Sequence, residues 1–315
     1  MLLRQLRFLD ALAREGDVGR AASACRVSVA SLATGLKELE KELGLVLLDR
    51  REHATELTQE GRSLLEWARG AISSMDGLAQ EAALLREGLT GTIRLGVIPT
   101  ASARLGTVLA PFLRDHPGVK VRAETLPARD AVAHILGREL DAALVYISES
   151  LGPGVKALPL YDETLVLVTS DPAWKSRRST VTWEEAATLP LCLLSPSLQN
   201  RTMVDRAMRS AGVRVEPRVE ADSVPALVDL GRSGYSCIVA DRWLDDRELP
   251  EGTRVYRLAE PTISPTVGLI TAQKLLVSPA TRALRDYLAA GTGGGAAATG
   301  APDGDAAATP APVNT

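Results

Sequence analysis

The chain of 315 residues lacks any apolar run that approaches the roughly 20 residues needed to cross a membrane. It also lacks the pattern of a secretory signal, because Arg4 and Arg7 interrupt the first apolar residues and no small-residue cleavage site follows. A net charge of −3 gives no support for a membrane surface as a partner. We therefore expect a cytoplasmic protein that binds no membrane, and the length fits two or three domains.

The motifs of the common enzyme classes are missing as well. The sequence contains no Gly-x-Ser-x-Gly elbow, no phosphate-binding loop and no dinucleotide fingerprint. The three histidines, His53, His116 and His134, show no ligand spacing among themselves or to the cysteines. These absences argue against an enzyme, and we expect neither a cofactor nor a metal ion.

Cysteine is scarce, and the three residues present are widely separated: Cys25, Cys192 and Cys237. Each lies in an apolar context, which is typical of buried thiols in a reducing compartment. We interpret them as core residues. A thiol switch is the alternative interpretation.

The most informative stretch that is present covers residues 17–43, which predict two helices joined by a tight turn at 26–28. Ser28 directly precedes the second helix and is expected to accept a backbone N–H as its N-cap. In that helix leucines recur at steps of four, three and four residues, so they share one face that should pack on the first helix. These leucines are Leu32, Leu36, Leu39 and Leu43.

The opposite face of the second helix is small near its start and basic further along. It carries Ala30, Ala33, Thr34, Lys37 and Lys41. A helix that enters the major groove while the preceding helix lies across the DNA backbone has the helix-turn-helix geometry. The alternative interpretation is an ordinary helical hairpin within a globular domain.

A wider pattern surrounds this hairpin and holds its order and spacing without a gap over about sixty residues. It consists of Leu6, Phe8, Arg20, Ala21, Ala22, Val27, Ser28, Leu32, Leu39, Glu40, Leu43, Gly44, Leu47, Arg50, Leu57, Thr58 and Gly61. In this pattern the chain resembles the LysR-type transcriptional regulators, and a weaker likeness extends to about Leu288.

The resemblance implies an α/β protein with three parts. An N-terminal winged helix-turn-helix DNA-binding domain would cover 1–58, and a long linker and dimerisation helix would cover 59–89. A two-lobed effector-binding domain like the periplasmic binding proteins would cover 90–290, with lobe one at 92–161 plus 267–290 and lobe two at 162–266. Residues 291–315 contain only small residues, Pro and two acids, and are expected to be disordered.

The resemblance also implies the DNA contacts, with the two wing arginines on phosphate: Ser28, Val29, Ala30, Ser31, Ala33, Thr34, Lys37, Arg50 and Arg51. Many family members carry Gln-Pro after the turn serine and Ser one turn later, and Phe where Leu48 stands. Here Val29, Ala30 and Ala33 take the first three places and can only touch a thymine methyl group. Base-specific hydrogen bonds would then come mainly from Ser31, Thr34 and Lys37.

The net charge of the N-terminal domain also departs from what is usual for a DNA-binding domain. Residues 1–62 carry ten Lys and Arg against ten Asp and Glu, a net charge of zero, whereas domains that bind nucleic acid are usually basic. The alternative function is therefore a regulator-derived dimeric sensor or interaction protein that binds DNA weakly and acts through a protein partner. A solute-binding transport protein is a third interpretation, which fits 92–290 but not the first ninety residues.

A long helix is expected from Thr58 to about Gly88, because apolar and small residues alternate steps of three and four throughout. The seam consists of Gly61, Leu64, Ala68, Ala71, Met75, Leu78, Ala82, Leu85 and Leu89. No second long helix follows to cover it, so we expect the same helix of another subunit, in a homodimer or a homotetramer. The alternative is packing on its own downstream domain.

Beyond residue 91 strands alternate with helices, which predicts a mostly parallel sheet with helices on its faces in each of two units. The expected strands are 92–98, 119–126, 141–147, 164–170, 190–195, 213–221, 236–240 and 266–271. The expected helices are 101–115, 129–139, 200–211, 223–233 and 279–290.

The effector site is expected where strands end and helices begin, because helix N-termini point amide hydrogens outward there. Hydroxyl side chains gather at these places: Thr100, Ser102, Ser148, Ser195, Thr202 and Ser223. The resemblance implies that the positions matching all of these except Ser195 commonly line the cleft between the lobes. Such donors suit a small anion or carboxylate, which Arg104 and Arg201 would neutralise. Plain helix capping is the alternative for each hydroxyl. The effector, the target genes and the sign of regulation are open.

Overall fold

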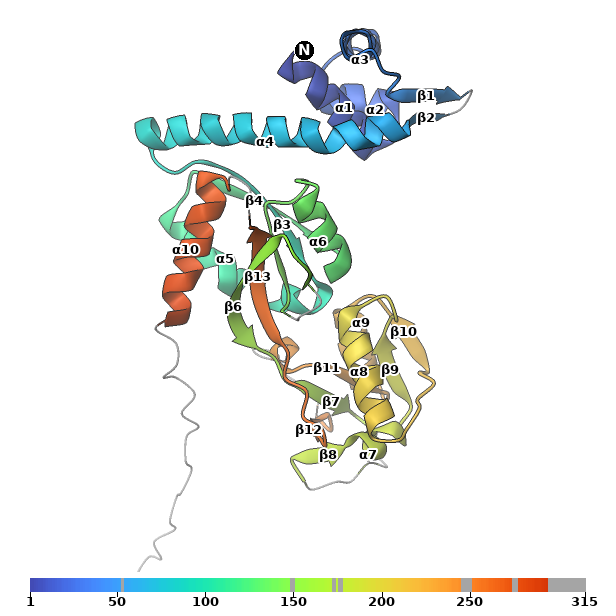
Figure 1. The fold of residues 1–315 in the computed structure, drawn as a ribbon. Coiled ribbons are helices and arrows are strands. Elements are labelled where there is room, and N and C mark those ends of the chain that lie inside the picture. The colour runs from blue at the N-terminus through green and yellow to red at the C-terminus, as the bar shows by residue number, and fades with distance from the viewer. Residues whose placement is uncertain are drawn as a thin grey trace, which may run out of the picture.

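The structure is a computed structural model that describes residues 1–51, 54–147, 151–171, 174, 178–244, 251–273 and 277–293. Residues 294–315, most of the segment expected to be disordered, lie outside the described residues. Figure 1 shows three parts in space: an N-terminal helical domain, one long helix beneath it, and two α/β lobes below that helix. The expected fold class is confirmed.

The N-terminal domain consists of three helices and a hairpin: α1 Leu3–Glu15, α2 Val18–Ala24, α3 Val29–Leu43, β1 Leu48–Arg51 and β2 Ala54–Leu57. Asp17 caps α2 by accepting the N–H of Arg20, and Ser28 caps α3 by accepting the N–H of Ser31 at 3.2 Å, as its position predicts. Arg26 takes a left-handed φ of 55° in the turn between α2 and α3.

The leucine face of α3 is buried at Leu32, Leu36 and Leu39, where it packs with Phe8 and Leu9 of α1. The prediction was wrong for Leu43, which is exposed. The reason is local, because α3 ends at Leu43 and Gly44 turns the backbone into the left-handed region, so the last turn lies beyond the core.

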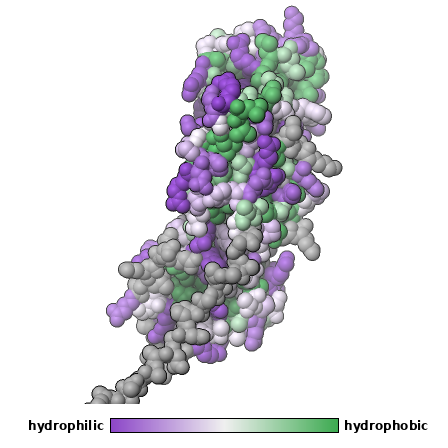
Figure 2. All heavy atoms as spheres, turned by 90° about the vertical axis from the view of Figure 1, so that its left-hand side faces the viewer, coloured by the Kyte–Doolittle hydropathy of each residue, from purple (hydrophilic) through white to green (hydrophobic). Residues whose placement is uncertain are grey.

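Helix α4 (Gln59–Glu87) begins under the N-terminal domain, with Thr58 accepting the N–H of Gly61 as its cap. Its first turns bury Gly61, Leu65 and Ala68 against that domain. Of the other predicted seam residues, Leu64 is partly buried against the same core and Leu89 against the core of lobe one. The seam between them is uncovered in the single chain, where Leu78 is 64% exposed and Leu85 is 83% exposed. Figure 2 views the molecule from the side on which α4 ends, and hydrophobic residues gather in the upper half of that surface.

Lobe one is a five-stranded sheet in the order β4-β3-β5-β13-β6. Its strands are β3 Gly91–Val97, β4 Val119–Thr125, β5 Ala142–Tyr146, β6 Val155–Asp162 and β13 Thr266–Ala272. Its helices are the 3-10 helix η1 Pro99–Arg104, α5 Leu105–Asp115, α6 Ala128–Leu136 and α10 Pro279–Gly293. The core lies between these layers and includes Phe112, Ile135 and Tyr146.

Lobe two is a six-stranded sheet in the order β10-β9-β11-β7-β12-β8. Its strands are β7 Leu165–Thr169, β8 Thr180–Thr182, β9 Leu191–Leu194, β10 Val219–Ala221, β11 Ser236–Ala240 and β12 Arg254–Ala259. Its helices are α7 Trp183–Ala187, α8 Gln199–Ser210, α9 Val224–Arg232 and the 3-10 helix η3 Asp241–Trp243.

Both sheets are mostly parallel, as expected, and each contains one strand that runs against all the others. In lobe one, β13 pairs antiparallel with β5 and β6, and in lobe two β7 pairs antiparallel with β11 and β12. The strands β13 and β7 are those that enter directly after the chain crosses from the other lobe, so they arrive in the opposite direction. The helix expected at 101–115 begins within the 3-10 helix η1, and the strand expected at 213–221 is only β10.

The two crossings between the lobes lie side by side at Glu163, whose N–H donates to the carbonyl of Pro265 at 3.0 Å. The Glu163 side chain is fully buried and accepts a hydrogen bond from the Tyr146 hydroxyl at 2.7 Å. Burial disfavours the charged form and raises the pKa of this carboxyl to about 7, the nearby Asp241 adding to the effect. The hinge, which we define as the two adjacent crossings between the lobes, therefore contains a carboxyl group that is largely protonated in mildly acidic solution.

We predict that Gly61→Ala lowers the free energy of unfolding by about 1–3 kcal/mol. A Cβ at residue 61 would lie 2.3 Å from the backbone oxygen of Leu47, which cannot move without breaking the link between α4 and the wing. The matched control is Gly77→Ala in the same helix, where a Cβ meets nothing within 4 Å. It should raise stability by about 0.5–1 kcal/mol. Urea unfolding followed by circular dichroism measures both, and equal shifts would contradict the clash.

We also predict that Glu163→Gln removes a pH dependence of stability. The folded protein keeps a proton that the unfolded chain releases near the ordinary pKa of 4.5. The free energy of unfolding of the wild type should therefore fall as the pH rises from about 4.5 to about 7, by on the order of 2–3 kcal/mol. Glutamine keeps the acceptor for Tyr146 but cannot ionise, so its curve should be flatter. Parallel wild-type and variant slopes in urea titrations at several pH values would refute this.

Candidate DNA-binding and effector-binding sites

The outer face of α3 is available for contact with a ligand. Val29, Ala30, Ser31, Thr34 and Lys37 are exposed on it, and Figure 1 shows α3 at the outer edge of the molecule, away from the lobes. Of the other predicted contacts on this helix, Ser28 is exposed at the cap and Ala33 is half-buried. The sequence-predicted residues on α3 are thus brought together on one accessible surface.

The wing is joined to α3 by one carboxylate. Glu40 Oε1 accepts the N–H groups of Leu47 at 2.9 Å and Leu48 at 3.1 Å, which ties the start of β1 to the last turn of α3. The antiparallel register pairs Arg50 with Thr55 and Arg51 with Ala54. The backbone of both arginines therefore lies at the end of a hairpin that projects from the same domain as α3 (Figure 1).

On α3 the acidic side chains make contacts within the domain, whereas the lysines are exposed to solvent. Acidic side chains of α3 are engaged within the domain, since Glu38 accepts from Gln5 at 3.1 Å and Glu42 pairs with the N-terminal amine. Lys37 and Lys41 are exposed, and neither pairs with an acidic side chain in the described part of the chain. A neutral composition therefore still leaves a basic edge along α3.

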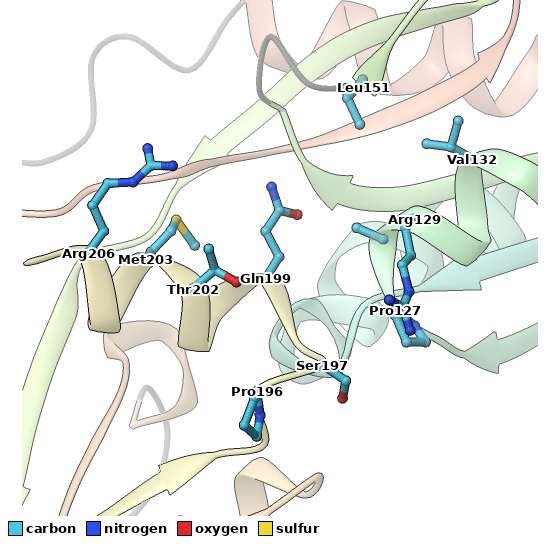
Figure 3. Close-up of a pocket in the computed structure, with 11 residues that line it drawn as sticks. Pro127, Arg129, Val132, Leu151, Pro196, Ser197, Gln199, Thr202, Met203 and Arg206 are labelled. Atoms are coloured by element: carbon cyan, nitrogen blue, oxygen red, sulfur yellow. The ribbon is translucent and has the colours of Figure 1, made fainter. Parts of the chain in front are cut away.

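A cavity of about 650 Å³ separates the lobes, a size suited to a small molecule. Its walls come from the first turns of α6 and from Leu151, which precedes β6, in lobe one and from the start of α8 in lobe two (Figure 3). Figure 3 shows Gln199, Thr202 and Met203 between the two arginines of the site, Arg129 and Arg206. The residues that line it are Pro127, Ala128, Arg129, Val132, Leu151, Pro196, Ser197, Gln199, Thr202, Met203 and Arg206.

A much smaller cavity of about 10 Å³ lies behind the first and shares Pro127, Ala128 and Gln199 with it. Thr100 and Asn200 line this inner space, and both are almost fully buried. Tyr146 also reaches it, and its hydroxyl donates to the hinge carboxyl described above. The inner end of the site therefore brings hydrogen-bonding groups of both lobes next to the hinge.

Only some of the predicted effector residues line the cavities between the lobes. Thr100 and Thr202 line the two connected cavities. The Ser102 hydroxyl donates to the carbonyl of Pro99 at 2.7 Å, and Ser223 accepts the N–H of Ala226 at 3.5 Å as the cap of α9. Ser195 bonds through its backbone to Ala221 and Leu198. Ser148 lies outside the described residues.

The arginines of the cavity differ from those expected. Arg201 is buried and donates to Asp205 at 2.7 Å and to Glu220 at 2.6 Å, and Arg104 lies over the ring of Tyr161. Instead, Arg129 from the first turn of α6 and Arg206 from α8 line the cavity, one from each lobe. Sequence reasoning missed both, although Arg206 follows Thr202 by four residues and so lies on the same face of a helix.

The surroundings of the three thiols disfavour their thiolate forms. Cys192 and Cys237 are register partners on β9 and β11, and both are fully buried. Burial raises the pKa of both thiols, that of Cys237 to about 12, and it also raises the pKa of the half-buried Cys25. Among the described residues, no group of His, Cys, Asp and Glu has the arrangement of a metal site. No helix in the described part of the chain is long and apolar enough to cross a membrane.

Two family models match the chain. The model described as "Bacterial regulatory helix-turn-helix protein, lysR family" matches residues 3–62, and "LysR substrate binding domain" matches residues 86–293. Together they cover the helix-turn-helix and both lobes. The described face of α3 and the cavity between the lobes lie within these two matches.

Proteins similar in sequence to this chain carry names of transcriptional regulators. The chain is 26% identical over 283 residues to the "Uncharacterized HTH-type transcriptional regulator YusT" of Bacillus subtilis, covering 89% of this chain and 93% of that protein. It is 34% identical over 214 residues to a "Probable hydrogen peroxide-inducible genes activator" of Mycobacterium avium, covering 67% of this chain and 68% of that protein.

Solved structures show the same fold. A full-length variant of OxyR from Pseudomonas aeruginosa superposes with a TM-score of 0.73 at 24% identity, covering 92% of this chain and 98% of that chain. Full-length CbnR in complex with its target DNA gives a TM-score of 0.66 at 21% identity, covering 93% of this chain and 100% of that one. The chain belongs to the LysR family of DNA-binding transcriptional regulators, which carry an effector-binding domain and are not enzymes.

Proposed function

We propose that this regulator acts in the cytoplasm as a homodimer or homotetramer and changes its DNA binding when a small acidic molecule fills the cavity between the lobes. The single observation that carries the proposal is the cavity itself. It joins cationic side chains of both lobes, Arg129 and Arg206, to hydroxyl and amide groups at Thr202 and Gln199. A carboxylate or other small anion matches these groups in charge and in hydrogen bonding.

The proposed DNA contacts are those of the exposed α3 face and the wing. Ser31, Thr34 and Lys37 are the hydrogen-bond donors toward base edges. Val29, Ala30 and Ala33 supply close apolar contacts, and Ser28 caps the helix at the DNA surface. Arg50 and Arg51 of the wing are assigned to phosphate. Because only a few donors reach the bases, much of the affinity should come from phosphate contacts and from the shape of the DNA.

The proposed effector mechanism uses the hinge. The lobes are joined by two adjacent crossings, so they can close about that point while each sheet stays intact. In the open cavity Arg129 and Arg206 carry like charge, and an anion between them replaces repulsion by two favourable contacts. A ligand that binds the closed form more tightly shifts the population toward it.

The proposed assembly uses the exposed apolar stripe on α4. Its members recur at steps of three and four residues, as in a helix that packs along another helix. The stripe consists of Trp67, Ala71, Met75, Leu78, Ala82 and Leu85, all exposed in the single chain. Pairing with the same helix of a second subunit would cover it and present two copies of α3 to two half-sites.

Two other functions compete with this proposal. A dimeric sensor that acts through a protein partner is favoured by the small residues at Val29, Ala30 and Ala33. A peroxide response is favoured by the names of several relatives, but thiols with raised pKa values form little of the thiolate that reacts with peroxide. We therefore propose recognition of a bound ligand and not thiol oxidation.

We predict sequence-specific, salt-dependent binding to the DNA upstream of the chain's own gene, altered by one member of a panel of small carboxylates. Phosphate contacts release counterions, so affinity should fall steeply between about 50 and 200 mM salt, by roughly a hundredfold or more. Arg206→Ala should abolish the ligand response without changing affinity for DNA alone. Mobility shift and footprinting measure both effects.

The matched control is Arg209→Ala, which removes an exposed arginine from the same helix outside the cavity and should keep the full response. Hydrogen peroxide in the same assay should leave the footprint unchanged. Weak, salt-insensitive binding would favour the interaction protein, and a footprint that changes only with peroxide would favour thiol chemistry. A panel response that survives in Arg206→Ala would remove this arginine from the site.

We further predict that Leu78→Glu dissociates the dimer. A carboxylate placed in the centre of the stripe would be buried without a partner in a helix pair, which is strongly unfavourable. Analytical ultracentrifugation should show self-association weakened by roughly a hundredfold or more. Ala79→Glu is the control, because it adds the same group one residue along the helix and about 100° around its axis. Equal effects of the two variants would show that the stripe is not the contact.

A further inference from the structure

The DNA-binding domain and lobe one of the same chain face each other across a hollow. A cavity of about 490 Å³ lies between them, with Leu12 and Leu57 of the N-terminal domain on one side and Glu139 of lobe one on the other. Leu65 and Arg69 of α4 also line it. Across this hollow the two domains are joined by discrete side-chain contacts, while elsewhere α1 packs along α4 and α10 of lobe one contacts α4, where Arg282 donates to Glu81 at 3.2 Å.

Arg69 makes such a contact on both sides of this hollow. Its Nε donates to Asp10 Oδ1 of α1 at 2.8 Å, and its Nη1 donates to Glu139 Oε1 in the loop after α6. The Arg69 side chain is only 11% exposed, so solvent screens these charged bonds less than it screens ion pairs on the surface. A planar guanidinium in two charged hydrogen bonds fixes geometry as well as supplying energy.

A second contact joins the same loop to α4. Arg138 has a φ of 59°, a left-handed conformation that is unfavourable for a residue with a Cβ. Its Nη1 donates to the carbonyl oxygen of Gly70 at 3.1 Å, beside Arg69. Two adjacent residues of the loop, Arg138 and Glu139, thus hold two adjacent residues of α4.

This loop is the C-terminal extension of α6, and the other end of α6 lines the effector cavity. Ala128, Arg129 and Val132 form part of the cavity wall, whereas the N–H of Glu139 donates to the carbonyl of His134 in the last turn at 2.7 Å. Figure 1 shows α6 with one end toward α4 and the other toward lobe two. One short helix and the loop that follows it therefore extend from the cavity to Arg69 of α4, which contacts the DNA-binding domain.

We propose that Arg69 is a positioning residue that fixes the DNA-binding domain to α6 and so transmits a displacement of α6 to the recognition helix. The path runs from Arg129 along α6 to Glu139, then through Arg69 to Asp10 of α1, which packs on α3. The inference rests on the proposed function in one respect, which is that ligand binding displaces α6. The bridge itself exists in the chain without ligand.

The test measures the distance between the two domains directly, in the full-length protein without ligand. Spin labels at the exposed positions Lys41 on α3 and Lys120 on β4 report it after replacement by Cys in a Cys25→Ser background. Labelled subunits are mixed with an excess of unlabelled ones, so that each measured pair lies in one chain. The wild type should give one narrow distribution by double electron–electron resonance.

Glu139→Gln removes the charge from one half of the bridge, and Asp10→Asn removes it from the other half. Each should broaden the distribution and raise the detached population roughly tenfold, with little change in the thermal midpoint. Glu139→Asp keeps the carboxylate and should recover most of the narrow distribution. Arg86→Ala, which breaks an exposed ion pair with the neighbouring Glu87 on the same helix, should change nothing.

The inference is overturned if Glu139→Gln and Asp10→Asn give distributions indistinguishable from those of the wild type and Arg86→Ala. It is also overturned if Glu139→Asp broadens the distribution as much as Glu139→Gln does, because the charge would then be irrelevant. The outcome is separable from the proposed function. Unchanged distances with normal DNA binding refute only the bridge, whereas broadened distances in a protein that binds no upstream DNA refute only the proposed regulator mechanism.

Discussion

The sensor part of this protein depends on one constraint, which is that the chain crosses twice between two sheets at a single point. The crossings are held together by the backbone bond from Glu163 to Pro265 and are buried beside the Tyr146 hydroxyl. Because each returning strand enters its sheet from the other lobe, both sheets become mixed and the strand ends face each other. The cavity between the lobes is a direct result of that connectivity.

A second principle concerns how charge is used within the N-terminal domain. Its composition is neutral, yet its acidic side chains on α3 are bound to Gln5, to the wing backbone and to the N-terminal amine. The basic side chains Lys37 and Lys41 stay in solvent. Net charge counted along a sequence therefore understates the basic character of a surface whose acids serve internal contacts.

Sequence spacing predicted the parts of this fold whose burial is periodic. The leucines of α3 and the seam of α4 follow from steps of three and four, and β3, β5 and β11 follow from short apolar runs. The strands β6, β8 and β12 were missed, because their burial is partial or one-sided and their sequences are interrupted by polar residues and Pro. Leu43 was misassigned because a helix end lies beyond the core that its spacing suggests.

The site was harder to predict than the fold for a reason seen in α8. Arg201 and Arg206 both lie on this helix, yet the first is locked to Asp205 and Glu220 and the second lines the cavity. Spacing gives the faces of a helix but not which face meets the other lobe. Only the three-dimensional arrangement of α6 against α8 separates a structural cation from one available to a ligand.

The exposure of Trp67 gives the molecule an optical property. Of its four tryptophans, Trp67 is 79% exposed at the edge of the apolar stripe, whereas Trp183 and Trp243 are buried and Trp174 is half-buried. An indole in water emits at longer wavelength than one in an apolar environment. In the single chain the red edge of the emission spectrum therefore comes mainly from this side chain, and pairing of α4 with another helix would shift the emission to the blue without an added dye.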